Sequence, residues 1–346
     1  MLAYINYASI KNMDKVDILV ATYNTKKEFL EKQLESIILQ TYKNIHIYIS
    51  DDCSSSEETK TVLKQFAKKD ERITLIFQEK NLGLNPNWNF LLSLSKSEYI
   101  MFSDHDDIWN LDKVEKSLEK IKQSNVDMVY TNCEQIDQNE KILHSSYFKY
   151  KNVPLVKGKN KIAFSRCIGI GCSQIITKNV KEQMIPFTKN VIAHDWLASF
   201  IANQNKGIDY IEKPLFKYRL HATNVFGGRS LEQNLNRWKK ENGKSYKSYL
   251  KYRNDAIKRA YLGGAEMGLD YIKMENLDID NKKINLEKYL NKLIKYYQNI
   301  EKTKFLNLNI LPYFKYLYGK NLTKKMIKEI VLFHFPIIGY IIFANN

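Results

Sequence analysis

Apolar runs of strand length alternate with segments of helical spacing over about the first 126 residues, and this alternation constrains the fold more than any other feature. The run at residues 16–21 is followed by a segment whose apolar residues recur at three- and four-residue intervals from Phe29 to Ile38. Further strand-like runs, each followed by a helical pattern, lie at residues 45–50, 73–77 and 99–102. This order predicts an α/β fold in which helices cover both faces of a mostly parallel sheet.

The alternation weakens in the middle of the chain. Three further strands and one helix are expected at residues 126–132, 174–177, 208–212 and 194–201, respectively. Past Gly228 the composition shifts to Lys, Asn, Tyr and Leu at helical spacing. We therefore expect an α/β domain over residues 1–228 and a basic, Tyr-rich helical region over residues 229–346.

The composition is that of a folded globular protein. The 346 residues are 44% hydrophobic and 27% charged, which excludes a disordered or fibrous chain. The N-terminal residues are mixed and polar, unlike a secretory signal, so a cytoplasmic protein is expected. The four cysteines, at positions 53, 133, 167 and 172, form no CxxC pair, which favours buried or inert thiols in a reducing compartment.

Positive charge is concentrated in the last third of the chain. Residues 231–346 carry 22 Lys and Arg against 11 Asp and Glu, and 12 of the 23 tyrosines. Basic and aromatic residues together suit nucleobase stacking or an anionic membrane surface, while amphipathic helices or an oligomer interface need neither. The apolar stretch at residues 331–343 is too short to span a bilayer and too apolar for a nucleic-acid arm. Peripheral membrane contact is therefore favoured over nucleic-acid binding, with a buried helix or homo-oligomer as the competing reading.

Three polar clusters follow three of the expected strands. They lie at residues 22–24, 51–54 and 104–107. Ligands of open α/β sheets bind outside the carboxyl ends of the strands, so these clusters are expected to converge on one crevice.

The third cluster contains three carboxylates directly after a buried strand. Asp104, Asp106 and Asp107 would repel one another and lose hydration there unless a positive charge lies against them. Mg²⁺ and Mn²⁺ use one or two carboxylates together with phosphate oxygens, so Asp104 and Asp106 suit a metal bound with a diphosphate. A solvated acidic turn or a helix cap is the alternative.

Taken together, residues 16–228 resemble the inverting glycosyltransferases of family 2, which have the GT-A fold. The matching segments are ATYN at 21–24, SIILQTY at 36–42, SDDCS at 50–54, NLG at 81–83, DHDDIW at 104–109, HDW at 194–196 and YRLH at 218–221. Within the family, HDW followed by YRLH looks most like bacterial rhamnosyltransferases that build surface polysaccharides. One departure is Cys53, where the family commonly has glycine, so the shape of that turn is open.

The resemblance implies a donor site. Residues Thr22, Tyr23 and Asn24 would lie along the nucleotide, and Asp52, together with Asp51, would accept the N3–H of uracil or thymine. The donor site would also include Asn81 at the nucleotide, Asp104 at the ribose and metal, and Asp106 as a ligand of Mg²⁺ or Mn²⁺. Arg219 and His221 would hold the diphosphate, with His221 also completing the metal shell.

The resemblance also implies a general base and an acceptor region. Asp195 would take the proton from an acceptor hydroxyl that attacks the anomeric carbon, which inverts that centre. Its neighbours His194 and Trp196 would lie at the diphosphate or acceptor. The residues alone leave plainer readings open, because Asp195 also suits a helix cap, His194 a structural histidine, and Trp196 core packing.

The expected function is therefore sugar transfer from a nucleotide sugar to a saccharide or lipid-linked acceptor. The resemblance implies dTDP-rhamnose as donor, with a UDP-hexose or UDP-N-acetylhexosamine as the alternative. A non-catalytic saccharide-binding module would not retain Asp52, Asp104, Asp106 and Asp195 together. A nucleic-acid-binding protein would explain the charge, but the basic excess lies outside the expected crevice.

Overall fold

The computed structural model describes residues 14–151, 153–160, 163, 167–221, 231–257, 262–274 and 281–302. The chain divides into two compact units. The first comprises residues 1–159, 169–187 and 201–221, and the second comprises residues 160–168, 188–200 and 222–346. The domain boundary expected at residue 228 lies outside the described residues.

Four parallel strands form one half of the sheet in the first unit, in the order β3-β2-β1-β4. They are β1 (Val16–Thr22), β2 (Ile45–Asp51), β3 (Ile73–Phe77) and β4 (Tyr99–Ser103). The register pairs Thr22 with Asp51 and Val20 with Ser103, so the strands finish nearly level. The loops that follow them therefore start at the same edge of the sheet.

The other half of the sheet is mixed. It contains β8 (Gln174–Thr177), β6 (Met128–Ile136), β9 (Ile208–Arg219), β5 (Ile108–Trp109) and β7 (Ile142–His144). Strand β8 runs antiparallel between β4 and β6, whereas β9 runs parallel to β6. Most residue pairing in the sheet is parallel, which confirms the expected α/β fold.

Strand β9 corrects one expectation, because a short strand ending at Glu212 had been expected before Pro214. The strand continues to Arg219, and the pairing with β6 shifts register around Asn132, which lies opposite Pro214. Asn132 Nδ2 donates to the Glu212 carbonyl at 2.9 Å. The irregularity accommodates the missing N–H of proline and lets β9 carry its last residues to the edge where β4 ends.

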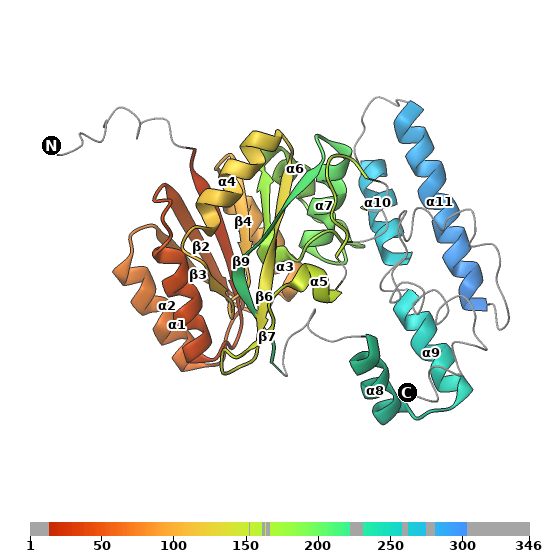
Figure 1. The fold of residues 1–346 in the computed structure, drawn as a ribbon, viewed down its shortest axis with the longest axis horizontal. Helices are drawn as coiled ribbons and strands as arrows, with labels where there is room; N and C mark the ends of the chain where they lie inside the picture. The colour runs from red at the N-terminus through yellow and green to blue at the C-terminus, as the bar shows by residue number, and fades with distance from the viewer. Residues whose placement is uncertain are drawn as a thin grey trace. The chain divides into compact units, whose positions relative to one another are not determined.

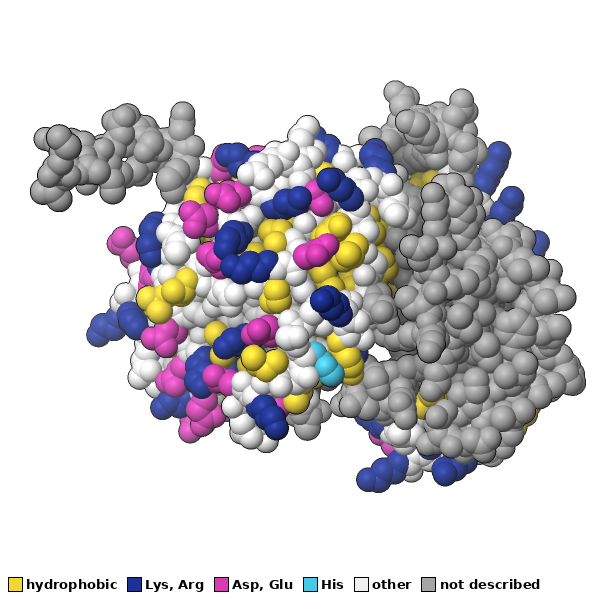
Figure 2. All heavy atoms as spheres, in the orientation of Figure 1, with side chains coloured by type: hydrophobic (Ala, Val, Ile, Leu, Met, Phe, Trp, Pro, Cys, Tyr) yellow, Lys and Arg dark blue, Asp and Glu magenta, His cyan; other side chains and the backbone are white. Residues whose placement is uncertain are grey.

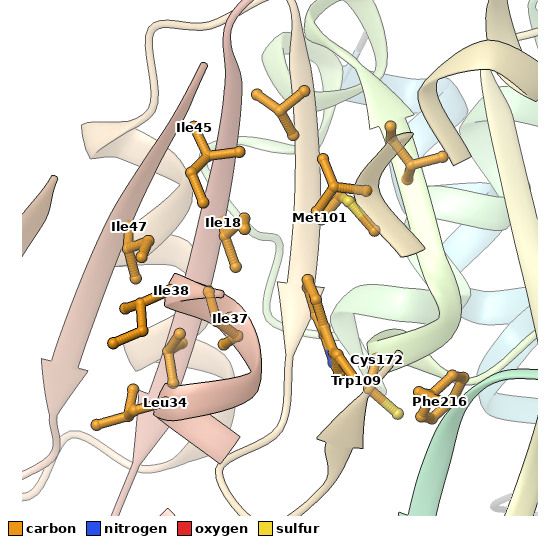
Figure 3. Close-up of a cluster of buried hydrophobic side chains, with 14 of the residues drawn as sticks. Ile18, Leu34, Ile37, Ile38, Ile45, Ile47, Met101, Trp109, Cys172 and Phe216 are labelled. Atoms are coloured by element: carbon orange, nitrogen blue, oxygen red, sulfur yellow. The ribbon is translucent and has the colours of Figure 1, made fainter. Parts of the chain in front are cut away.

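Helices cover both faces of this sheet (Figure 1). The helices of the first unit are α1 (Lys27–Ile38), α2 (Glu57–Lys69), α3 (Leu84–Leu94), α4 (Lys113–Ser124), α5 (Tyr147–Lys151) and α6 (Lys178–Met184). Buried residues of α1, α2 and α4 pack with one face, including Ile18, Ile47 and Met101 (Figure 3). On the other face, Trp88 of α3 packs edge-on against Phe102, with ring centroids 5.5 Å apart. Neighbouring residues of β4 thus point to opposite layers, as in a sheet buried on both sides.

The second unit is helical in its described part. It contains the start of α7 (His194–Gln204), then α8 (Leu231–Asn242), α9 (Tyr246–Ile257), α10 (Gly263–Met274) and α11 (Asn281–Lys302). A Cβ on Gly264 would lie 2.3 Å from the Trp196 ring, and one on Gly268 would lie 2.5 Å from the Phe200 ring. The two glycines are one helical turn apart on α10, and the two aromatic residues are one turn apart on α7. The rings of Trp196 and Phe200 therefore pack against α10 at the places where glycine has no side chain.

None of the helices in the described part of the chain is long and apolar enough to cross a membrane. The apolar stretch at residues 331–343 lies outside the described residues. On the face drawn in Figure 2, the described Lys and Arg side chains are interspersed with Asp and Glu.

Candidate active site

Asn24 joins the loops that follow β1 and β2. Its side-chain oxygen accepts the backbone N–H groups of Ser55 and Ser56 at 2.9 and 3.1 Å, and its own N–H donates to Ser54 Oγ at 2.8 Å. Its φ of 47° is in the left-handed region, which asparagine tolerates better than most residues. The preceding residue, Tyr23, is 48% exposed, so the loop presents an aromatic ring to the solvent.

Asp51 and Asp52 are both buried but bind different partners. Asp51 closes its own turn, accepting the N–H and the hydroxyl of Ser54 at 2.9 and 2.6 Å. The Asp52 carboxylate accepts the backbone N–H groups of Leu82 and Gly83 at 2.6 and 2.9 Å. These bonds fasten the loop after β2 to the loop after β3. Each carboxylate oxygen keeps a second acceptor position for a donor such as a pyrimidine N3–H.

Asn81 lies in the same arrangement, because its Nδ2 donates to the Asp52 carbonyl at 3.1 Å. Between Asp52 and Ser54, the residue Cys53 has a φ of 61°. This left-handed conformation is one that glycine adopts without strain. A cysteine thus occupies a position whose backbone conformation favours glycine.

The acidic loop after β4 meets the end of β9 in a direct contact. His221 Nε2 lies 2.6 Å from Asp106 Oδ2, and both side chains are largely buried. Burial alone would raise the pKa of Asp106, but the neighbouring His105 and His221 lower it overall. Two of the three expected metal ligands are thus in contact, although they are 115 positions apart in the sequence.

The two other carboxylates of this loop have raised pKa values. Burial and the charge of Asp106 raise the pKa of Asp104 to about 6. Burial and both neighbouring carboxylates raise the pKa of Asp107 well above its ordinary value. Three carboxylates in one buried loop repel one another when ionised, and a divalent cation would remove that repulsion. The Asp106–His221 contact supplies a carboxylate and an imidazole of the type that a divalent metal uses, while the expected role of Asp104 as a third ligand of the same ion stays a prediction.

Arg219 has a supporting position beneath the acidic loop. Its side chain is fully buried, its Nε donates to the Asp106 carbonyl at 2.8 Å, and its backbone N–H donates to Asp107 Oδ1 at 3.0 Å. The guanidinium also lies over the Phe29 ring, 4.4 Å from the centroid. These contacts hold the loop in place, while the expected contact with a diphosphate stays a prediction.

Thr25 and His105 form a link that the sequence did not indicate. Thr25 Oγ1 is 2.9 Å from both Thr22 Oγ1 and His105 Nδ1. The end of β1 is thereby connected to the residue between Asp104 and Asp106. Thr25 and His105 are 80 positions apart, so no local sequence pattern connects them. Only their side-chain types, a hydroxyl and an imidazole, are compatible with a hydrogen bond.

Lys113 and Cys172 also lie at this site, although the sequence did not indicate either residue. Lys113 is fully buried, its Nζ donates to the Cys172 carbonyl at 2.5 Å, and it lies 3.5 Å from the centre of the Trp109 ring. Burial lowers the pKa of Lys113 to about 7. In the sequence, Lys113 has the appearance of an ordinary surface lysine at a helix start. The Cys172 thiol lies beside Asp104 and Asp107, a proximity that no motif spacing could indicate.

The other predicted site residues, His194, Asp195 and Trp196, belong to the second unit. Asp195 Oδ1 accepts the Trp196 backbone N–H at 2.8 Å, and the Cys167 thiol faces the Asp195 carboxylate. His194 is buried, which lowers its pKa to about 3, so it is neutral near pH 7. Trp196 is buried against Gly264, as its packing interpretation predicts.

Known proteins with similar sequences are glycosyltransferases. The family model described as glycosyl transferase family 2 matches residues 17–184. The dTDP-rhamnosyl transferase RfbG of Shigella flexneri is 27% identical over 303 residues, which is 79% of this chain and 99% of RfbG. The uncharacterised glycosyltransferase MJ1057 of Methanocaldococcus jannaschii is 27% identical over 235 residues, covering 65% of this chain and 78% of MJ1057.

Solved structures agree on the fold. The crystal structure of residues 1–349 of Staphylococcus aureus TarS, in complex with UDP-GlcNAc, aligns with a TM-score of 0.54 and 16% identity. The alignment covers 88% of this chain and 80% of that chain. The matching family model, the related glycosyltransferases and the shared fold lead to one conclusion: residues 17–184 belong to glycosyltransferase family 2, and the chain has the GT-A fold.

Proposed function

We propose that this glycosyltransferase moves rhamnose from dTDP-rhamnose, with inversion, to a hydroxyl of a saccharide or lipid-linked saccharide during surface polysaccharide synthesis. The match to RfbG supports the donor sugar, because it extends over 99% of that rhamnosyl transferase. A 26% match over 230 residues to TuaG of Bacillus subtilis, described as a putative teichuronic acid biosynthesis glycosyltransferase, supports the polysaccharide role; it covers 65% of this chain and 83% of TuaG.

The contact between Asp106 and His221 carries the proposal. Together with Asp104 it places two carboxylates and an imidazole at the sheet edge where β1, β2 and β4 end. We assign Asp104, Asp106 and His221 as the residues that would hold Mg²⁺ or Mn²⁺, which neutralises a diphosphate leaving group when bound. A mannosyltransferase of Pyrobaculum calidifontis, solved with GDP-Man and Mn²⁺, has a similar fold, with a TM-score of 0.50 and 16% identity over 96% of this chain and 86% of that chain.

We assign the donor nucleotide to the loops after β1, β2 and β3, which the hydrogen bonds of Asn24 and Asp52 hold together. Residues Thr22, Tyr23 and Asn24 would lie along the nucleoside, and Asp52 would accept the pyrimidine N3–H at an acceptor position that its bonds to Leu82 and Gly83 leave open. Asp51 and Asn81 keep this loop in shape through their bonds to Ser54 and Asp52. Arg219 supplies positive charge near the developing diphosphate.

We assign the general base to Asp195. Its carboxylate would take the proton of the acceptor hydroxyl while the oxygen forms a bond to the anomeric carbon. The bond from that carbon to the diphosphate oxygen breaks, and the electron pair leaves with the nucleoside diphosphate. His194, neutral near pH 7, and Trp196 would flank the diphosphate or acceptor.

The test is a donor screen with purified protein. We expect dTDP-rhamnose to give metal-dependent release of dTDP in the presence of acceptor, and an inverted anomeric configuration in the product by NMR. Matched reactions contain UDP-glucose, UDP-N-acetylglucosamine, or excess chelator. Release from a UDP-sugar alone would replace rhamnose with the alternative donor, and full activity with chelator would remove the metal assignment.

The basic C-terminal region supports peripheral contact with an anionic membrane on the cytoplasmic side. Residues 231–346 carry a net charge of +11 of the total +16. Each basic residue near an anionic leaflet contributes on the order of 1 kcal/mol, and salt screens the attraction. We expect the full chain to sediment with anionic vesicles at low salt but not with neutral vesicles. Failure to sediment would leave helix packing or a homo-oligomer interface as the role of this region.

A further inference from the structure

A second group of metal-ligating atoms lies behind the contact between Asp106 and His221. Ligand atoms of Asp104, Asp107 and Cys172 all lie within 4.8 Å of one another. The two carboxylates come from the loop after β4, and the thiol comes from the 3-10 turn η3 (Gly171–Ser173) that precedes β8. Asp107 and Cys172 are fully buried, whereas Asp104 is partly exposed. The group is therefore reached from the side of Asp104.

The Asp107 carboxylate has an unsatisfied oxygen in this group. Its Oδ1 accepts the Arg219 backbone N–H at 3.0 Å. Its Oδ2 is buried and accepts no hydrogen bond from an N–H or O–H group of the described residues. The polar neighbour on that side is the Cys172 thiol, which is a weak donor. A buried oxygen without a strong partner costs folding free energy unless a ligand binds it.

We propose that Asp104, Asp107 and Cys172 form a site for a thiophilic divalent cation such as Zn²⁺, distinct from the proposed Mg²⁺ or Mn²⁺ position at Asp106 and His221 but sharing Asp104 with it. A thiolate with two carboxylates suits zinc or cadmium, whereas magnesium prefers oxygen ligands alone. Two ligand atoms on one tetrahedral zinc lie about 3.5 Å apart, so atoms that lie up to 4.8 Å apart need to approach one another by up to about 1.3 Å. Binding releases the thiol proton to solvent.

The charge of the surroundings balances in the bound state. The Lys113 ammonium is held at the Cys172 carbonyl and over the rings of Trp109 and Phe216, at 3.5 and 4.5 Å from their centroids. Figure 3 shows Cys172, Trp109 and Phe216 together at one end of the buried cluster. One thiolate, two carboxylates, one ammonium and one divalent cation sum to zero, which a low-dielectric site requires.

Zinc at this site would engage Asp104, which is also assigned to the donor site. Zinc is therefore expected to inhibit sugar transfer even when magnesium is saturating. This consequence rests on the proposed function, whereas the binding itself does not. A spectroscopic readout of binding consequently separates failure of the site from failure of the proposed activity.

The test is a cadmium titration of metal-free full-length protein, followed by the ultraviolet charge-transfer band of the cadmium–thiolate bond. All samples carry Cys53→Ser, which removes the exposed thiol. Cys172→Ser is compared with Cys133→Ser, another buried cysteine, and with Cys167→Ser. We expect the band to persist in both controls and to disappear in Cys172→Ser. A band of the same strength in Cys172→Ser, or no band in the parent protein, overturns the proposal.

Asp107→Asn provides a second variant that keeps the Oδ1 acceptor for the Arg219 N–H. Cadmium affinity is expected to fall at least about tenfold, the scale reached even by indirect partners of metal ligands. Unchanged affinity overturns the assignment of Asp107. Circular dichroism and melting of each metal-free variant confirm that it is folded.

Inhibition by zinc is measured as the release of nucleoside diphosphate at saturating Mg²⁺. Each rate is divided by the rate of the same variant without zinc. Zinc is expected to inhibit the parent protein and to lose that effect in Cys172→Ser. Equal inhibition of both proteins overturns the shared use of Asp104.

Discussion

The carboxylates of the two units are held in different ways. In the first unit, Asp52 accepts backbone N–H groups from the loop after β3, and Asp107 accepts the backbone N–H of the last residue of β9, so the fold itself fixes both carboxylates. In the second unit, Asp195 sits in the first turn of α7, next to Trp196, whose ring packs against the backbone of Gly264. We infer that changes in the first unit act mainly through charge, whereas changes in the second act through helix packing as well.

The largest effect is expected from Asp106→Ala in the first unit. Transfer should fall on the order of a thousandfold, because several kcal/mol of charge stabilisation at the diphosphate is lost. Stability should change little, because the loss of the His221 contact and the relief of repulsion among the carboxylates oppose each other. Release of nucleoside diphosphate and thermal melting measure the two effects. Full activity in the variant would sink the metal assignment.

Asp195→Asn in the second unit is expected to lower turnover by roughly a hundredfold or more, with donor affinity unchanged. The amide keeps the size of the side chain and the acceptor for the Trp196 N–H, but it cannot take a proton. Steady-state kinetics with separate kcat and KM values provide the measurement. Lost donor binding with normal turnover would assign Asp195 to the donor site instead.

Gly264→Ala tests whether packing sets the position of α7. The new Cβ would overlap the Trp196 ring at 2.3 Å, so we expect a loss of up to about 3 kcal/mol in the free energy of unfolding. Turnover should fall more than donor affinity. The double variant Gly264→Ala with Trp196→Phe should recover stability, measured by urea denaturation. Additive losses in the double variant would contradict this packing.

His194 gives the second unit a pH dependence. Burial lowers its folded pKa to about 3, whereas the unfolded value stays near 6.5, so the unfolded chain binds a proton first as the pH falls. Stability is therefore full above pH 6.5 and is lost toward pH 3, by about 2 kcal/mol between pH 7 and pH 5. His194→Gln should flatten this slope in urea denaturation. The same slope in both proteins would assign it to other groups.

The smallest effect is expected from Cys53→Gly in the first unit. Glycine removes about 1 kcal/mol of strain at the φ of 61° but increases the entropy of the unfolded chain, leaving a gain of a few tenths of a kcal/mol. Cys53→Ala keeps a Cβ and should give no gain, which makes it the matched control. Denaturation midpoints of the two variants measure the difference. A larger gain from alanine would mean that the thiol, not the backbone, is the source of the strain.

The sequence alone determined the parallel half of the sheet and the edge where the site lies. Strands β1 to β4 and helices α1 to α4 follow local apolar periodicity, which short-range physics dictates. Asp52, Asp104 and Asp106 could be assigned to one crevice because carboxyl ends of parallel strands finish together. The roles given to these residues and to Asp195 stay predictions.

Only the tertiary structure decided how distant segments return to that edge. Strand β8 enters antiparallel, β9 continues past Pro214, and Arg219 becomes buried beneath the acidic loop. The Cys172 thiol reaches Asp104 and Asp107, and Gly264 receives Trp196, without any local pattern that announces either contact. Such contacts depend on the free energy of packing between elements far apart in the chain, whereas sequence periodicity reports only which face of each element is buried.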